Sequence, residues 1–253
     1  MAHARQAVLG RPGMDFEDER IALACAFRWT ARFDMHESVA NHFSLAVNET
    51  GTKFLMNPRG RHFSRIRAGE LLLLDSGDEE TMARPDAPDP TAWALHGSIH
   101  RRVRHARCVL HVHSKNASVL ACLADPTLPP VDINAMRFWG RMNVDHGFDG
   151  MSLDDEAERI SKALDNKPIL LMRNHGVMAI GETVARTFDD LYYFERACST
   201  YIAALQTGRE LGAVSDEVAA KTARQWLDYP ELGDDHFREL QGILDREEPS
   251  YRR

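Results

Sequence analysis

Apolar and polar positions along the first third of this 253-residue chain follow periods that predict one helix and several short strands. Apolar residues over 15–33 recur at helical spacing and predict a long helix. The apolar runs 43–47 and 53–56 are separated by turn-forming residues, so they predict a hairpin. A further apolar run at 71–74 predicts a short buried strand.

The rest of the chain predicts helices and strands in mixed order. After a proline-rich irregular loop, the expected elements are a helix over 91–104 capped by Thr91, a strand at 108–113, a helix at 116–124, strands at 169–172 and 177–180, and a long helix over 183–206. Beyond it, Gly208, Gly212, Pro230 and Gly233 predict breaks between short helices. The mixture of elements, with hairpins among them, favours a single α/β domain.

Composition agrees with a soluble globular protein, since 43% of residues are hydrophobic and 27% are charged. The net charge of -7 gives no support to a nucleic-acid or anionic-membrane partner. The first fourteen residues lack the apolar run of a signal peptide, and we expect a loose tail there. No segment approaches a membrane-spanning length. Four widely spaced cysteines without a Cys-x-x-Cys pair predict buried reduced thiols and a cytoplasmic location.

His111 and His113 are the first candidates for chemistry. Side chains two residues apart in a strand project from the same face, so both imidazoles could bind one metal ion. A solvated strand end is an equally good interpretation of the pair alone. His175 is the third candidate, in an Asn-His-Gly turn between two apolar strands. It could equally be a turn residue without further function, and only the fold can bring it to the other two.

His96 and His100 form a rival pair, because residues four apart share one face of a helix. That spacing also suits a metal. However, Ile99 and Val103 lie on the same stripe, which favours a core-facing helix whose histidines are satisfied by hydrogen bonds.

Five motifs occur here in the order seen in class II aldolase/adducin domains, and the resemblance covers residues 15–206. They are Asn41-His42-Phe43 followed by Ser-Leu-Ala-Val, Asn57-Pro58-Arg59-Gly60, His111-Val112-His113-Ser114, Asn174-His175-Gly176-Val177, and Tyr192-Tyr193-Phe194-Glu195-Arg196-Ala197. The resemblance implies an αβα sandwich with a central mixed or antiparallel sheet, and a homotetramer with active sites between subunits. It also implies one divalent metal ion per subunit (zinc, manganese or iron) on His111, His113 and His175. We therefore expect a tail at 1–14, the metal-binding domain at 15–210 and a helical extension of it at 211–253.

The chain departs from the sugar-phosphate aldolases that it resembles. The position of their acid/base glutamate corresponds to Ala92, and a methyl group cannot transfer protons. Their phosphate-binding serines correspond to Pro90 and Thr91. Arg59 stands in the phosphate-binding turn, and its planar guanidinium suits a carboxylate. The resemblance places His42, Gly60 and Thr91 near it as substrate-binding residues, although Arg59 could also be a solvated turn residue.

These features favour a metal-dependent carbon–carbon lyase that acts on a small anionic substrate. Decarboxylation of an aromatic or heteroaromatic hydroxy acid needs no base before cleavage, and the missing carboxylate favours it over retro-aldol cleavage of an unphosphorylated hydroxy-carbonyl substrate. The motifs are also compatible with an iron-dependent oxygenase and with a non-catalytic adducin-like interaction domain.

The resemblance also suggests Asn134 and Arg137 as residues that a neighbouring subunit contributes to catalysis, although a helix packed at an interface would explain them equally well. His146 is either a proton donor or a loop histidine. Glu195 either orients a ligand imidazole or is an ordinary core-edge carboxylate paired with Arg196 or a lysine.

Overall fold

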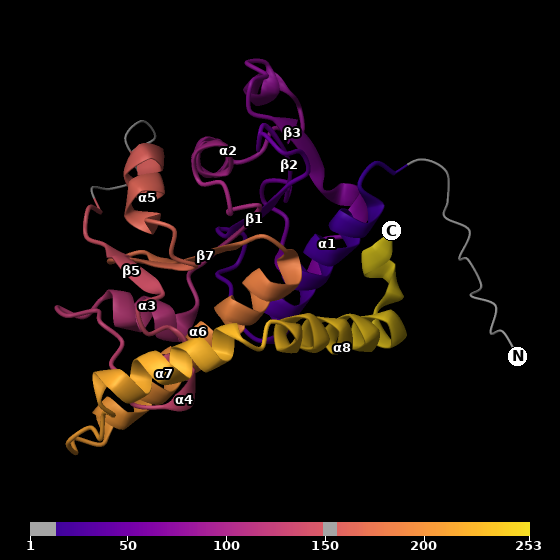
Figure 1. Ribbon diagram of the computed structural model, residues 1–253. Helices are drawn as coiled ribbons and strands as arrows, with labels where there is room; N and C mark the ends of the chain where they lie inside the picture. Colours follow the sequence, from indigo (N-terminus) through magenta and orange to yellow (C-terminus); the bar gives the residue numbers. More distant parts are fainter. Residues whose placement is uncertain (1–13, 149–155) are drawn as a thin grey trace, which may run out of the picture.

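The computed structural model describes residues 14–148 and 156–253 (Figure 1). The helices in these ranges are α1 (Glu17–Arg32), α2 (Pro90–Arg102), α3 (Lys115–Ala121), α4 (Ile133–Arg137), α5 (Glu156–Leu164), α6 (Val184–Gln206), α7 (Asp216–Leu227) and α8 (Glu231–Glu247). The strands are β1 (His42–Ala46), β2 (Lys53–Met56), β3 (Leu72–Asp75), β4 (Cys108–Val112), β5 (Met142–Asp145), β6 (Ile169–Met172) and β7 (Gly176–Gly181). Short 3₁₀ helices lie at Phe63–Arg65, Ala68–Glu70, Thr81–Ala83 and Pro249–Arg252.

The strands form one sheet in the order β3-β2-β1-β4-β7-β6-β5. Every neighbouring pair is antiparallel except β5 and β6, which run parallel at one edge. The expected mixed, mainly antiparallel sheet is therefore confirmed. β4 lies at the centre of the order, between β1 and β7, and its carboxyl end is the place where His111 and His113 were expected.

Helices cover both faces of this sheet and make the molecule a three-layer αβα sandwich (Figure 1). On one face, α1, α3, α6 and α8 pack on the larger core, which includes Leu110 and Val112 of β4. On the other face, α2 and α5 pack over a second core that includes Val109 of the same strand. Burial of each large apolar side chain stabilises the fold by roughly 1.5–3 kcal/mol. Because side chains alternate along a strand, burying Leu110 and Val112 on one face of β4 determines that Val109 and His111 point to the other. His111 consequently projects toward α2 and α5.

Several elements differ from those that the sequence predicts. α4, β5 and α5 were not expected, because each is short and β5 (Met-Asn-Val-Asp) has no continuous apolar run. The helix α8 is long, and Gly233 lies inside it rather than breaking it. A side chain there would meet Asp189 of α6 at 3.2 Å, so glycine permits close packing of these two helices.

Two further expectations were wrong. The cap of α2 is Asp89, whose carboxylate accepts hydrogen bonds from the backbone N–H of Thr91 and Ala92. An Asp followed by proline at the first helical position is a strong start signal for a helix. All four cysteines are free thiols, but Cys122 is exposed because it lies at the end of α3, beyond the core.

The segment after Gln206 packs back onto the main body of the chain through α8. Trp29 of α1 donates its indole N–H to the carbonyl of Leu240 at 2.9 Å, and Arg32 forms ion pairs with Glu247 and Glu248. At the other end of the chain, the expected tail lies outside the described residues apart from Met14, which contacts the larger core.

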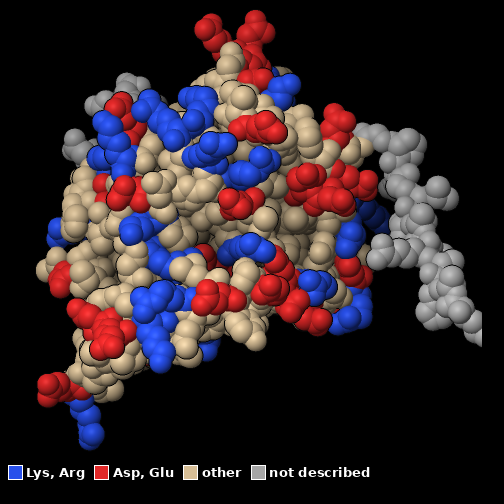
Figure 2. Space-filling view, in the orientation of Figure 1, with Lys and Arg blue, Asp and Glu red and all other residues tan. Residues whose placement is uncertain are grey.

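Acidic and basic side chains are interspersed over the face of the molecule drawn in Figure 2. Within the part of the chain that the structure describes, none of the helices combines the length and the apolar character that crossing a bilayer requires.

Candidate metal centre

The fold brings together the three histidines that the sequence singled out. His111 lies in β4, His113 follows the end of that strand, and His175 lies in the turn between β6 and β7. Their ring centroids are 4.8–5.0 Å apart in all three pairs. One nitrogen from each ring lies within 4.8 Å of the other two, which is the arrangement expected of ligands around one small cation.

Hydrogen bonds on the outer side of two rings determine which nitrogens face inward. The Nδ1 of His111 lies 3.1 Å from the carbonyl of Val177, and the Nδ1 of His113 lies 2.6 Å from a carboxylate oxygen of Glu37. Both partners only accept hydrogen bonds, so each Nδ1 carries the proton. In the neutral rings the two Nε2 atoms, 3.1 Å apart, then direct their lone pairs at each other. A cation that accepts both lone pairs removes this repulsion.

Burial keeps the candidate ligands in the form that binds metal. It lowers the pKa of His111 well below the ordinary value, and it lowers the pKa of His175 to about 4, with a further contribution from the charge of His113. The Nδ1 of His175 is also buried without a hydrogen-bond partner in the described residues. Neutral imidazoles with free nitrogens are suitable ligands for a divalent cation, so this donor set fits the group.

The turn that carries His175 depends on its neighbours on either side. Asn174 has a φ of 56°, in the left-handed region that asparagine tolerates better than most residues. At Gly176, a Cβ would lie 2.5 Å from the carbonyl oxygen of Val112 and 2.8 Å from the ring of His113. The absence of a side chain at this position lets the start of β7 approach the end of β4, which brings His175 to the other histidines.

Glu195 of α6 is hydrogen-bonded to the segment that follows β4. Its carboxylate accepts hydrogen bonds from the hydroxyl of Ser114 and from the backbone N–H groups of Asn116 and Ala117. It therefore caps the first turn of α3, directly after His113. Neither role that the sequence suggested for Glu195 is observed, because it contacts no ligand imidazole and its partners are at this helix terminus rather than a basic side chain.

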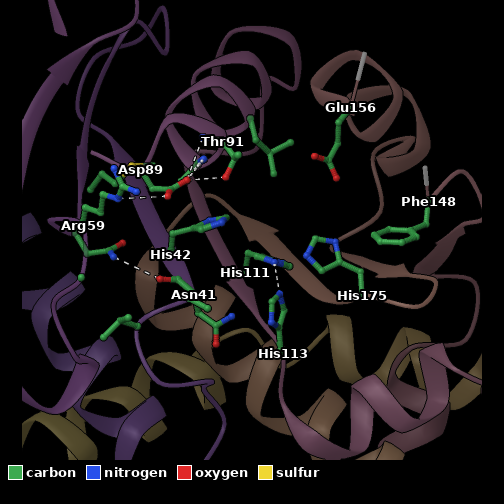
Figure 3. A pocket seen from close by; sticks show the side chains of 17 residues that line it. Asn41, His42, Arg59, Asp89, Thr91, His111, His113, Phe148, Glu156 and His175 are labelled. Carbon is green, nitrogen blue, oxygen red and sulfur yellow. Dashed lines mark hydrogen bonds and ion pairs between the residues drawn. The ribbon is translucent and has the colours of Figure 1, made fainter. Parts of the chain in front are cut away.

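A cavity of about 420 Å³ opens over the three histidines (Figure 3). It is also lined by the four residues expected to bind substrate, namely His42, Arg59, Gly60 and Thr91. Ala92 also lines this cavity, so the cavity has no carboxylate at that position. The side chain of Arg59 is 68% exposed, and its Nε lies 3.9 Å from Asp89. Arg59 is thus held loosely enough to bind an anion.

Four residues of the cavity and its surroundings were not among those expected from the sequence. Asp89, Phe148 and Glu156 line it, and Glu37 holds His113 from outside. Burial raises the pKa of Glu156. The start of α2 could have revealed Asp89, whereas no local pattern distinguishes the other three.

Other candidates lie outside the cavity. Asn134 and Arg137 belong to α4, and the guanidinium of Arg137 is bound to the carboxylates of Asp189 and Asp190. Within one chain, Arg137 is therefore a structural residue of α4 and α6 rather than part of this site. His146 is an exposed loop residue after β5.

The rival pair on α2 has no ring nitrogen left for a metal. His96 is hydrogen-bonded to His42 and Ser44, and His100 to Ser44 and the carbonyl of Ala106. Both imidazoles are buried, so the interpretation as core-facing histidines with satisfied hydrogen bonds is confirmed.

A family model described as the class II aldolase and adducin N-terminal domain matches residues 21–202, well over half of the chain. The chain belongs to the class II aldolase and adducin family. A solved structure of an aldolase II superfamily protein from Pseudomonas syringae has a TM-score of 0.86 and 29% identity, covering 96% of this chain and 98% of the other. The family recognition and the fold class are therefore both confirmed.

Two curated relatives within the class II aldolase and adducin family carry names that indicate different reactions. A putative aldolase class 2 protein from Caulobacter vibrioides is 27% identical over 92% of this chain and 91% of its own length. The decarboxylase NovR from Streptomyces niveus is 28% identical over 80% of this chain and 75% of its own length. The family thus includes proteins named as aldolases and a protein named as a decarboxylase.

Proposed function

We propose that this protein is a divalent-metal-dependent carbon–carbon lyase, and that it decarboxylates an aromatic or heteroaromatic hydroxy-carboxylate. The observation that carries the proposal is the convergence of His111, His113 and His175 in one cavity, with the outer nitrogens of two rings already bound to acceptors. A divalent cation held there would act as a Lewis acid toward a substrate oxygen. Zinc, manganese and iron(II) all bind such a donor set.

Arg59 is the proposed anchor for the substrate carboxylate. Its guanidinium is exposed at the mouth of the cavity, and its one ionic neighbour among the described residues, Asp89, is 3.9 Å away. Gly60 leaves open space beside it, since no atom lies within 4 Å of the position that a Cβ would take. The hydroxyl of Thr91 donates to Asp89 at 2.6 Å, so it is left to accept a hydrogen bond from the substrate.

The absence of a carboxylate at Ala92 supports decarboxylation over retro-aldol cleavage. Retro-aldol cleavage begins with removal of a hydroxyl proton, whereas decarboxylation of an aromatic hydroxy acid needs no such base. The ring carbon that bears the carboxylate first takes up a proton, as electron density moves from the hydroxyl oxygen through the ring onto that carbon. The bond to the carboxyl carbon then breaks, carbon dioxide departs, and the electron pair of that bond restores the aromatic ring. The reaction therefore needs a proton donor.

Glu156 is the proposed source of this proton. It lines the cavity on the side of His175, and burial raises its pKa, so a larger fraction of it is protonated than of an exposed glutamate (Figure 3). In Glu156→Gln, kcat should fall while KM changes little, because the substrate contacts made by Arg59 remain. A kcat equal to that of the wild type would exclude Glu156 as the donor.

The proposal is tested by metal analysis together with product analysis. Purified wild-type protein should contain about one metal ion per chain and release carbon dioxide from members of a hydroxy-carboxylate panel. His111→Ala should lose both properties, whereas the matched control His146→Ala, in an exposed loop, should keep them. Unchanged metal content in His111→Ala would refute the ligand assignment.

Retro-aldol cleavage remains the second candidate, favoured by the aldolase name of the Caulobacter relative. An aldehyde product without carbon dioxide would establish it. The name of the family also covers adducins, and a chain that binds no metal and has no turnover would favour a non-catalytic interaction domain.

We further propose a cytoplasmic homotetramer with active sites near subunit interfaces. Free thiols at all four cysteines support the location. Apolar side chains exposed on α4, at the end of α7 and just after it support association, with Ile133 58%, Leu227 55% and Tyr229 68% accessible. Light scattering after size-exclusion chromatography measures the mass, and a monomer at micromolar concentration would contradict the assembly.

A further inference from the structure

A line of hydrogen-bonded side chains runs from the cavity into the interior between β1 and α2. The Nδ1 of His42 lies 2.7 Å from the Nε2 of His96, and the Nδ1 of His96 bonds to the hydroxyl of Ser44. The same hydroxyl lies 2.7 Å from the Nε2 of His100, whose Nδ1 lies 2.7 Å from the carbonyl of Ala106. The two residues of β1 are spaced two apart and the two of α2 four apart, so each pair shares one face of its element.

The carbonyl at the inner end gives this line a single direction. Since Ala106 can only accept, His100 carries its proton on Nδ1 and accepts at Nε2. Ser44 therefore donates to His100, and its oxygen accepts from the Nδ1–H of His96. His96 then accepts at Nε2, and the donor of that bond is the Nδ1–H of His42. In the neutral ring, His42 is left with an unprotonated Nε2.

Burial supports the assumption that every ring in the line is neutral. His96 and Ser44 have no exposed surface, and His100 is 5% exposed. Desolvation lowers the pKa of His100 to about 4 and that of His96 well below the ordinary value. The inner part of the line, from His96 to His100, is thus shielded from water, and a reversal of its direction would leave the Ala106 carbonyl facing a bare ring nitrogen.

The outer end of the line lies at the proposed reaction site. His42 lines the cavity, and its ring centroid is 4.9 Å from that of His111, its register partner on β4 (Figure 3). The hydrogen bond that the His42 side chain forms among the described residues is made by Nδ1, so its Nε2 has no partner there, and His42 is not a member of the three-histidine group. This nitrogen is therefore placed beside the candidate metal site, where a bound substrate would meet it.

We propose that the line from Ala106 to His42 is a tautomer lock, which makes His42 an obligatory hydrogen-bond acceptor and so selects substrates with a hydroxyl donor beside the carboxylate. The inference rests on the proposed function for the location of the substrate. His42 touches the substrate, whereas His96, Ser44 and His100 are positioning residues that act through it. A methyl ether in place of the hydroxyl would leave the Nε2 acceptor unpaired and would be rejected.

The first arm of the test measures the tautomers directly. Full-length, metal-free protein labelled with ¹⁵N-histidine is sedimented and examined by solid-state NMR, which separates protonated from unprotonated ring nitrogens. Glutamine substitution at His42, His96 and His100 in turn assigns the resonances. We expect all three rings to carry the proton on Nδ1. A proton on Nε2 of His42 in the wild type overturns the proposal, whatever the reaction proves to be.

The second arm measures recognition without turnover. Binding of salicylate and of 2-methoxybenzoate to Zn²⁺-loaded protein is compared by calorimetry. Wild-type protein should prefer salicylate by roughly tenfold or more, as expected when a buried polar group loses its partner. In Ser44→Ala the line is cut, His42 can adopt the Nε2–H form, and the preference should fall by a similar factor while Zn²⁺ content stays the same.

Two further substitutions serve as a control and as a rescue for both measurements. Ser98→Ala removes a different buried serine, which lies on α2 outside the line, and should change neither the tautomer of His42 nor the preference for salicylate. Ser44→Thr restores a hydroxyl and should restore both. An unchanged preference in folded Ser44→Ala overturns the proposal, and the wild-type spectrum decides it if Ser44→Ala does not fold. Loss of Zn²⁺ in His42→Gln would instead make His42 a metal ligand and overturn its role as acceptor.

Discussion

Arg137 joins α4 to α6 through two buried carboxylates, and its removal should destabilise the fold while leaving the metal centre intact. Its guanidinium lies 2.6 Å from Asp189 and 2.8 Å from Asp190, and these side chains are 10%, 2% and 11% exposed. Removing one partner of a buried ion pair typically costs about 3–5 kcal/mol, because the other charge is left without compensation. Asp189 keeps His236 and Asp190 keeps Arg141, so Arg137→Leu should lie near the lower end, about 3 kcal/mol.

Urea unfolding at a fixed protein concentration measures this loss. Arg186→Leu is the matched control, since Arg186 lies on α6 and pairs with Asp234 at 2.8 Å with 50% and 35% of the side chains exposed. An exposed pair of this kind contributes less than about 1 kcal/mol. The two variants should therefore separate clearly in their free energies of unfolding.

The loss in Arg137→Leu should also depend on pH. Burial alone would raise the pKa of Asp189, but the hydrogen bond from His236 and the charge of Arg137 hold it below the ordinary value. A carboxylate with a lowered folded-state pKa contributes stability above its unfolded pKa, near 3.9, and loses it as the pH falls through the folded value. The difference between wild type and Arg137→Leu should thus be largest above about pH 5 and shrink toward pH 3.

The reasoning would be refuted by a variant with wild-type stability. If Arg137→Leu unfolds within about 1 kcal/mol of the wild type but loses activity, Arg137 acts in catalysis, as a residue that one subunit contributes to the site of another. If instead the variant is destabilised while its folded fraction keeps one metal ion per chain, Arg137 is a structural residue.

Three further predictions concern the metal centre. Glu37→Gln should weaken Zn²⁺ binding by about 10- to 100-fold, because a neutral amide holds the Nδ1–H of His113 less firmly. Competition with a chromophoric chelator measures the Kd, and an unchanged Kd would contradict the role of Glu37 in orienting His113. Gly176→Ala should lower both Tm and Zn²⁺ affinity at a cost of about 1–3 kcal/mol, since the new Cβ would lie 2.5 Å from the Val112 oxygen; a wild-type Tm would show that the close approach is unnecessary. Metal-free protein should lose stability as the pH falls from 6.5 toward 4. Burial lowers the pKa of His175 to about 4, so in this pH range only the unfolded chain takes up a proton at His175. A Tm that stays constant between these pH values in thermal melts would refute the prediction.

The sequence alone determined the main elements of the fold and the candidate ligands. Hydrophobic periodicity is a local signal, so it located α1, the β1–β2 hairpin, β4, the β6–β7 hairpin and α6 to within a few residues. The spacing of His111 and His113 placed both on one face of a strand for the same reason. Elements without a long apolar stripe, such as β5 and α5, were missed because their positions depend on the strand or helix beside them.

Only the tertiary structure decided which residues meet. His175 reaches β4 because the backbone at Gly176 can approach Val112, and nothing near either residue in the sequence encodes that approach. Glu37 faces His113, and Glu195 caps α3, across long separations in the chain. Hydrogen bonds and ion pairs require atoms within about 3–4 Å, and folding brings such atoms together without leaving a periodic signal in the sequence.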